Sequence, residues 1–238
     1  MLFFYIRHGD PIYNPDSLTP LGHRQAEAVG RMLSRYKINT VYASTSERAK
    51  LTANPLCEIT KNKMQLLDFA NEMHAWRDLT CYSPARGCED WIFRAPEIKE
   101  LFHDPDLIAL GHRWYEHQEF ASERFAGKNY RAGIERIQNG SDELFESLGY
   151  KRVGDGKYEV VEHSDKRVAL FAHQGFGIAF LSCVLGIPYP AFATHFDIFT
   201  TGVTVIEFAN VNGFAYPKVL THSSAAHLYK EGLPTVYD

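Results

Sequence analysis

Residues 2–9 read Leu-Phe-Phe-Tyr-Ile-Arg-His-Gly, so that Arg7 and His8 directly follow five large apolar side chains. An apolar run without alternation is typical of a strand covered on both faces of a parallel sheet. Such sheets bind ligands just beyond the carboxyl ends of their strands, and Gly9 lets the backbone turn there. A neutral imidazole can attack phosphorus, and a guanidinium offers paired donors to phosphate oxygens. The stretch therefore predicts a buried strand that ends in a phosphate site.

A second strand of the same kind also ends in a histidine. Residues 168–172 are apolar, His173 follows them, and residues 176–185 have the composition of a buried helix that ends before Gly186. The backbone N–H groups that begin such a helix form an anion-binding end. We therefore expect two histidines to face one phosphate group.

Two further charged residues follow predicted strands. Residues 40–44 predict a strand, and Arg48 lies in the first turns of the helix after it. Residues 64–69 predict another strand, and Glu72 comes just past its end. A carboxylic acid at this edge of the sheet is suited to protonate a departing alkoxide. Asp10, close to His8 in the sequence, is the alternative candidate for this acid.

These motifs, together with the segment Leu-Thr-Pro-Leu-Gly-His-Arg-Gln-Ala at residues 18–26, resemble those of the histidine phosphatase superfamily, also called the phosphoglycerate mutase-like family. The resemblance covers residues 1–75 and 166–210 and is weak between them. It implies that His8 is transiently phosphorylated and that Glu72 is the general acid. It further implies a site made of the catalytic side chains His8, Glu72, His173, Arg7 and Arg48, with Gly9, Asn14 and Gln174 among the groups that bind phosphate or substrate.

The order of the elements predicts an α/β fold. Strands alternate with helices, which favours a mainly parallel sheet with helices on both faces. Thr19 is the expected N-cap of the first helix, with Pro20 at its first position. Residues 201–208 predict a strand nearer an edge, and residues 219–220 a short one. The resemblance implies a three-layer αβα sandwich with one strand running against the others.

The segment of about residues 76–165 is the part of the chain that the motifs describe least. It is rich in aromatic side chains, and residues 107–125 and 130–148 have helical character. We expect a single domain over residues 1–238, in which this segment forms an insertion that caps the phosphate site. Four of its basic residues are candidates for contacts with the leaving group: Arg77, Arg86, Arg94 and His112.

The composition restricts the classes of partner. The net charge of −4 gives no electrostatic reason to expect binding to nucleic acid or to an anionic membrane. The four cysteines show no metal-ligand spacing, and neither a targeting segment nor a membrane-spanning stretch is seen. We therefore expect a cytoplasmic protein that needs no metal and no cofactor and acts on a small phosphomonoester. Its oligomeric state is not predicted.

The leading interpretation is a metal-independent phosphomonoester hydrolase that forms a phosphohistidine. A phosphoglycerate mutase is the alternative within enzymes. It is less favoured because residues 10–13 read Asp-Pro-Ile-Tyr, where mutases have a small hydroxyl residue, and because the Phe-x-Gly-Trp segment of mutases is missing. The alternative of another class is a scaffold that binds a phosphorylated ligand without turnover.

Overall fold

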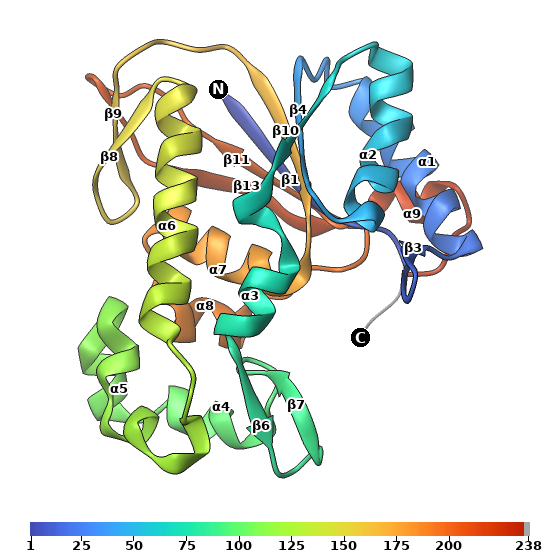
Figure 1. Cartoon of the computed structure of the whole chain (residues 1–238). Coiled ribbons are helices and arrows are strands. Elements are labelled where there is room, and N and C mark those ends of the chain that lie inside the picture. The colour runs from blue at the N-terminus through green and yellow to red at the C-terminus, as the bar shows by residue number, and fades with distance from the viewer. Residues whose placement is uncertain (236–238) are drawn as a thin grey trace.

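The fold is built on one six-stranded sheet, seen in the computed structural model of Figure 1, which describes residues 1–235. Strand β11 (Val203–Glu207) is antiparallel to both of its neighbours. Strands β1 (Leu2–Arg7), β10 (Arg167–Ala172), β4 (Thr40–Ser44) and β5 (Met64–Leu67) are parallel to one another. The predicted mainly parallel sheet with one opposed strand is therefore confirmed. The strands lie in the order β13 (Lys218–Ser224), β11 (Val203–Glu207), β1 (Leu2–Arg7), β10 (Arg167–Ala172), β4 (Thr40–Ser44) and β5 (Met64–Leu67).

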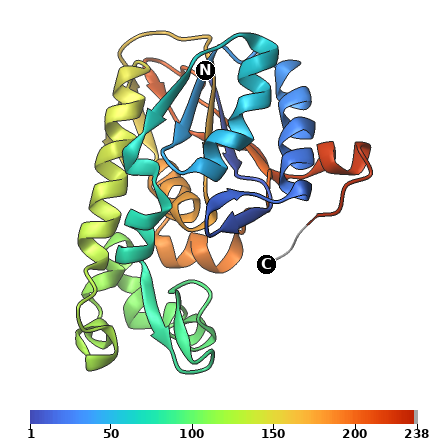
Figure 2. The ribbon, with the colours of Figure 1, turned by 45° about the vertical axis from the view of Figure 1, so that its right-hand side comes forward.

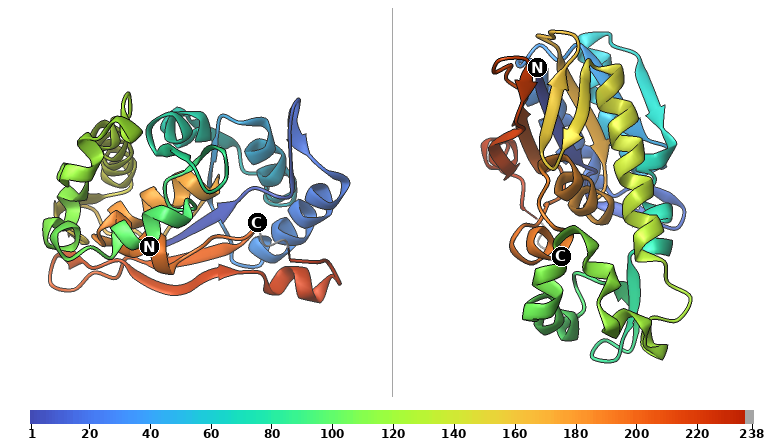
Figure 3. Two further views of the ribbon diagram at one scale, coloured as in Figure 1. Left: turned by 90° about the horizontal axis from the view of Figure 1, so that it is seen from below. Right: turned by 90° about the vertical axis from the view of Figure 1, so that its left-hand side faces the viewer.

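Helices cover both faces of this sheet, as the views in Figures 2 and 3 show. Alternate residues of β1 point to opposite faces: Phe4 packs with α1 (Pro20–Ser34) and α2 (Glu47–Thr60), and Phe3 packs with α6 (Tyr130–Ser147) and α7 (Gln174–Leu185). Phe3 and Phe4 are fully buried, and each such side chain stabilises the fold by about 1.5–3 kcal/mol. The expected three-layer arrangement is confirmed.

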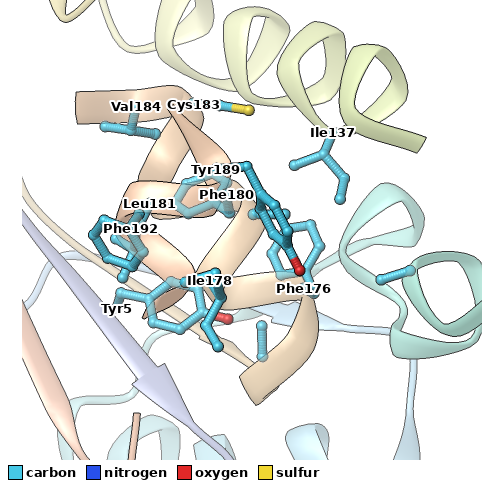
Figure 4. Packing of buried hydrophobic residues seen from close by; sticks show 14 of the residues in the cluster. Tyr5, Ile137, Phe176, Ile178, Phe180, Leu181, Cys183, Val184, Tyr189 and Phe192 are labelled. Atoms are coloured by element: carbon cyan, nitrogen blue, oxygen red, sulfur yellow. The ribbon is translucent and has the colours of Figure 1, made fainter. Parts of the chain in front are cut away.

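Helix α7 lies in the interior with almost every residue buried, as Figure 4 shows for its apolar side chains. Its phenylalanines stack on the ring of Tyr5, the last large aromatic residue of β1. The Tyr5 hydroxyl donates to the carbonyl oxygen of His173 (2.6 Å) and accepts from the N–H of the same residue (3.2 Å). Strand β1, which is followed by His8, therefore also fixes the turn between β10 and α7 that carries His173.

The first helix begins as the sequence predicts. Thr19 is the N-cap of α1, its side chain accepts from the N–H of Gly22 (3.0 Å), and Pro20 opens the helix. Arg48 lies in the first turn of helix α2, as predicted, and the helix runs through Pro55 to Thr60. A two-stranded hairpin of β2 (Pro11–Tyr13) and β3 (Asp16–Leu18) lies between β1 and α1.

The segment after β5 divides into a projecting part and a part on the sheet. Helix α3 (Glu72–Asp78) leads into the projecting part, which lies below the sheet in Figure 1. This part contains the hairpin of β6 (Thr80–Ser83) and β7 (Cys88–Trp91), followed by α4 (Pro96–Phe102), α5 (Pro105–Leu110) and the 3₁₀ turns Gly111–Glu116, Gln118–Ala121 and Glu123–Phe125.

Two of the expectations for the insertion have different outcomes. The helix expected over residues 107–125 is broken after α5, because Gly111 adopts a positive φ of 57° and the chain continues in 3₁₀ turns around the buried ring of Trp114. The helix expected over residues 130–148 is confirmed as α6, but it packs on the sheet rather than in the projecting part, with Phe145 against Phe3.

The remaining elements complete the two ends of the fold. A small antiparallel sheet follows α6, helix α8 follows α7, and α9 packs on α1. Their bounds are β8 (Tyr150–Gly154), β9 (Lys157–Val160), β12 (Phe214–Ala215), α8 (Tyr189–His195) and α9 (Ala226–Lys230). Within residues 1–235, none of the helices is both long enough and apolar enough to cross a lipid bilayer.

Candidate active site

The two predicted histidines lie side by side at the carboxyl ends of adjacent strands. Strands β1 and β10 are parallel neighbours, with Arg7 opposite Ala172, and the His8 and His173 rings are 5.2 Å apart between centroids. A cavity of about 790 Å³ opens over this edge. Its walls are formed by Arg7, His8, Tyr13, Asp16, Thr45, Ser46, Glu47, Arg48, Lys50, Asn71, Glu72, Met73, Trp76, Asp90, Trp91, Arg94 and Gln174.

The His8 ring is held in one orientation and kept neutral. Its Nδ1 lies 2.7 Å from the carbonyl oxygen of Gly9, which can only accept, so Nδ1 carries the proton and Nε2 keeps a lone pair. Burial lowers the pKa of His8 well below its usual 6.5, and the charges of Arg7 and Arg48 lower it further. A neutral imidazole with a free Nε2 is a competent nucleophile.

Residue 9 has to be a glycine for steric reasons. A Cβ at this position would lie 2.7 Å from the carbonyl oxygen of Gly22 in α1. The Gly9 N–H donates to the hydroxyl of Thr52 in α2 (3.0 Å), so the loop after β1 is tied to both helices on its side of the sheet. Gly9 itself lies beneath the cavity wall and supports His8 through its carbonyl group.

Arg48 is directed into the cavity by the hairpin of β2 and β3. Its guanidinium donates to Asp16 Oδ1 (2.7 Å), while Asp16 Oδ2 accepts from the backbone N–H of Glu47 (2.8 Å). The ring of Tyr13 lies 5.4 Å from the guanidinium carbon. One carboxylate thus caps α2 and orients the arginine at the same time. Neither Asp16 nor Tyr13 was marked by any sequence motif.

Arg7 is the second arginine at the site. Its guanidinium donates to the carbonyl oxygen of Ile198 (2.8 Å), and the residue is almost fully buried while it lines the cavity. Arg7 at the end of β1 and Arg48 in α2 therefore line the same cavity. Two arginines at one opening are suited to bind a phosphate dianion.

Glu72 caps helix α7 across the cavity floor. Its Oε1 accepts from the N–H of Gly175 (3.0 Å) and its Oε2 from the N–H of Phe176 (2.9 Å). Burial raises the pKa of Glu72 above its usual 4.5, although the Phe176 N–H and the Arg48 charge act in the opposite direction. The carboxyl group therefore keeps its proton to a higher pH than an exposed glutamate.

Asp10, the alternative acid, lies outside the cavity walls. Its Oδ2 accepts from the hydroxyl of Thr19 (2.6 Å), and its N–H donates to the side-chain oxygen of Gln25 (2.8 Å). The side chain therefore takes part in the start of α1. Of the two candidate acids, Glu72 is the one that lines the cavity.

His173 is completely buried beneath the cavity. Its Nε2 lies 2.8 Å from the hydroxyl of Ser44 at the end of β4. Burial lowers the pKa of His173 well below 6.5, and His8 and the two arginines add to the effect. Gln174, the next residue, reaches the cavity wall and donates to Asp197 (2.6 Å).

Of the other predicted contacts, only Arg94 lines the cavity among the described residues. Asn14 is exposed at the turn between β2 and β3, where Tyr13 and Asp16 form the wall instead. Among the basic residues of the insertion, Arg94 lines the cavity. Arg77 pairs with Asp78, Arg86 with Asp90 and His112 with Asp155.

Solved structures show the same fold. The phosphoserine phosphatase of Entamoeba histolytica, in complex with 3-phosphoglyceric acid, is 16% identical, with a TM-score of 0.58 over 95% of this chain and 98% of that chain. The mycobacterial glucosyl-3-phosphoglycerate phosphatase with inorganic phosphate is 18% identical, with a TM-score of 0.61 over 95% and 98%. A putative alpha-ribazole-5'-P phosphatase of Escherichia coli is 18% identical, with a TM-score of 0.60 over 94% and 96%.

The comparison with protein families concerns the first part of the chain. No curated protein matches the chain in sequence. The family model of the histidine phosphatase superfamily, branch 1, matches residues 3–97, which include His8, Arg48 and Glu72. The resemblance noted from the motifs is thereby confirmed by a match to the histidine phosphatase superfamily model over residues 3–97.

Proposed function

We propose that this protein is a metal-independent phosphomonoester hydrolase that works through a phosphohistidine on His8. The observation that carries the proposal is the state of the His8 ring. The Gly9 carbonyl holds the proton on Nδ1, burial keeps the ring neutral, and the residue lines a cavity that also contains both arginines. These features support a nucleophilic Nε2.

The first half of the reaction transfers the phosphoryl group to the enzyme. His8 Nε2 attacks phosphorus in line with the ester oxygen, the bond from phosphorus to that oxygen breaks, and Glu72 gives its proton to the departing alkoxide. Arg7 and Arg48 stabilise the charge on the equatorial oxygens. In the second half, ionised Glu72 removes a proton from water, which attacks phosphorus and restores neutral His8 with release of inorganic phosphate.

His173 has the role of a neutral donor in this scheme. We assign the Ser44 hydroxyl as the donor of the hydrogen bond to His173 Nε2. The imidazole then carries its own proton on Nδ1. That Nδ1 atom is buried without a hydrogen-bond partner within residues 1–235. A buried donor of this kind gains a partner when a phosphoryl oxygen enters, which stabilises the bound state by about 1–3 kcal/mol.

The substrate is proposed to be a small phosphorylated metabolite. The three solved structures described above are named as phosphatases of phosphoserine, glucosyl-3-phosphoglycerate and alpha-ribazole-5'-P. The cavity of about 790 Å³ falls within the size of sites for small molecules. Within a single domain, the projecting part between α3 and α6 is proposed to cap the leaving group through Trp91 and Arg94, together with Trp76 of α3.

The proposal is tested by trapping the phosphoenzyme. Purified protein is mixed with an aryl phosphate in the presence of a chelator, quenched within milliseconds and digested for mass spectrometry. We expect an acid-labile phosphoryl group on His8, steady release of phosphate, and loss of both in His8→Ala. His163→Ala is the matched control, because His163 is an exposed histidine outside the cavity walls.

Other outcomes would identify the alternatives. Phosphate that binds without any phosphoenzyme or release would indicate a ligand-binding scaffold. A phosphoenzyme that passes its group to a second phosphorylated substrate rather than to water would indicate a mutase. Turnover in His8→Ala, or turnover that the chelator abolishes, would refute the proposed mechanism.

A further inference from the structure

An aromatic residue of the projecting part lies directly against the turn that carries the Glu72 carboxyl group. A Cβ built on Gly175 would lie 2.4 to 2.6 Å from three atoms of the six-membered ring of Trp91. The N–H of the same glycine donates to Glu72 Oε1 (3.0 Å). The indole ring and the carboxyl group therefore meet at one residue of α7, and both line the cavity.

The indole ring is fixed in this place by its own hairpin. Trp91 is 6% exposed and pairs with Thr80 across β6 and β7. Its backbone N–H donates to Asp90 Oδ1 (2.8 Å). Its ring meets Trp76 of α3 edge to face at 5.0 Å and stacks on Phe93 at 5.8 Å. The hairpin of β6 and β7 follows α3 and turns back, so that Trp91 packs against Trp76 of α3 and against Gly175 in the first turn of α7.

We propose that Trp91 is a positioning residue for the general acid: its ring holds the first turn of α7 against Glu72 and keeps water away from the carboxyl group. This inference rests on the proposed function of Glu72. It assigns to the projecting part a role in the chemistry as well as in covering the leaving group.

The reason for this role is the cost of ionising a carboxyl group without water. Burial is the largest influence on the pKa of Glu72 and raises it. The charged and titratable groups that act on Glu72 from neighbouring elements are Arg7 and Tyr5 of β1, Arg48 of α2 and Tyr189 of α8. The two arginines favour the ionised form, so the protonated acid depends on the dry, apolar side of the site, which Trp91 supplies.

The experiment compares Trp91→Ala and Trp91→Phe with Phe93→Ala. Phe93 belongs to the same aromatic stack, whereas the close contacts with Gly175 are those of Trp91. Two readouts are used. The first is the titration of the Glu72 carboxyl carbon by NMR in protein without substrate, assigned by its loss in Glu72→Gln. The second is kcat as a function of pH for glycerol 3-phosphate and for p-nitrophenyl phosphate.

We expect Trp91→Ala to lower the pH at which Glu72 titrates by about one unit or more, because water then solvates the carboxylate. On the alkaline limb, only the protonated fraction of Glu72 is active. A shift of one unit therefore lowers kcat for glycerol 3-phosphate about tenfold more than it lowers kcat for the aryl phosphate. Trp91→Phe keeps a ring over Gly175, so we expect the Glu72 titration and kcat for glycerol 3-phosphate to stay close to those of the unmodified protein. Phe93→Ala is expected to change neither of these two quantities.

The outcomes separate this inference from the proposed function. An unchanged titration in Trp91→Ala would overturn the inference, as would an equal loss with both substrates, which is the result of a purely structural role. A shifted titration in a protein that hydrolyses neither substrate would support the contact between Trp91 and the acid but refute the proposed function. Circular dichroism of each variant checks that the fold is retained.

Discussion

Replacement of Glu72 by glutamine removes a proton while it keeps the shape of the side chain. Both carboxyl oxygens accept backbone N–H groups of α7, at 3.0 Å from Gly175 and 2.9 Å from Phe176. A glutamine offers one oxygen and one NH₂ group, so one of these backbone donors must face another donor. We therefore expect Glu72→Gln to lower the free energy of unfolding by about 1–3 kcal/mol, the cost of a buried hydrogen-bonding group left without a partner.

The effect on catalysis depends on the leaving group. A positioned general acid contributes roughly 10²–10⁴ to a rate when an alkoxide has to leave. Since a factor of ten corresponds to about 1.4 kcal/mol of barrier, the expected loss is about 3–5 kcal/mol for an alkyl phosphate. A stabilised phenolate leaves without a proton, so phosphorylation of His8 by p-nitrophenyl phosphate is expected to change by less than about tenfold.

The assay is the rate of phosphoenzyme formation in a single turnover, measured for a series of alkyl and aryl phosphates of graded leaving-group pKa. Asp10→Asn is measured beside Glu72→Gln, because Asp10 contacts Thr19 at the start of α1 instead of the cavity. The slope of log rate against leaving-group pKa should steepen in Glu72→Gln and stay unchanged in Asp10→Asn. A steeper slope in Asp10→Asn alone would refute the assignment and move the acid to the loop after His8.

Three further predictions concern pH and stability. Because burial holds the pKa of His8 well below 6.5, kcat/KM for p-nitrophenyl phosphate, whose leaving group needs no proton from Glu72, should not decline through protonation of His8 as pH falls through 6.5. A pH–rate profile for this substrate that declines with falling pH from above 6.5 contradicts this. Burial lowers the pKa of His227 to about 4 from 6.5, so the folded state binds fewer protons than the unfolded state between these values. The free energy of unfolding therefore decreases as pH falls from 6.5 toward 4. In urea titrations, this decrease should be smaller in His227→Gln by about 3 kcal/mol. Gly186→Ala should lower Tm more than Gly213→Ala, because both residues have positive φ but a Cβ at Gly186 meets the N atom of Gly156 at 2.3 Å and one at Gly213 meets nothing within 4 Å.

The sequence predicts the parts of this fold that are encoded locally. The apolar run before Arg7 and the cap Thr19-Pro20 specify a strand and a helix through neighbouring residues, and both elements are confirmed. The strand expected nearer an edge over residues 201–208 is also found, as β11 beside the edge strand β13. His8 and His173 come together because parallel neighbouring strands end at one edge of the sheet.

The parts that the sequence does not predict depend on contacts between distant segments. The ion pair between Asp16 and Arg48 joins a hairpin to a helix, and no periodicity in the sequence marks Asp16 as the partner of Arg48. Trp91 is one of several aromatic residues in the insertion, and its contact with Gly175 follows from how the hairpin folds back. The helix expected over residues 107–125 is interrupted at Gly111, and the ring of Trp114 beyond it packs against Phe102, which precedes the expected helix.

The position of β1 in the middle of the sheet has a consequence for the order of synthesis. Both of its neighbours, β10 and β11, come from residues 167–207, so the strand that carries His8 leaves the ribosome long before its partners. Until then its apolar residues and unpaired backbone groups are exposed in the nascent chain, as is typical of folds with long-range strand pairing. The carbonyl oxygens of Arg7 and His8 both accept from the N–H of Thr201 at 3.1 Å, and this donor is synthesised later still. A ribosome-bound chain that ends before Thr201 therefore lacks the N–H group that bonds to the backbone on either side of the nucleophile's attachment.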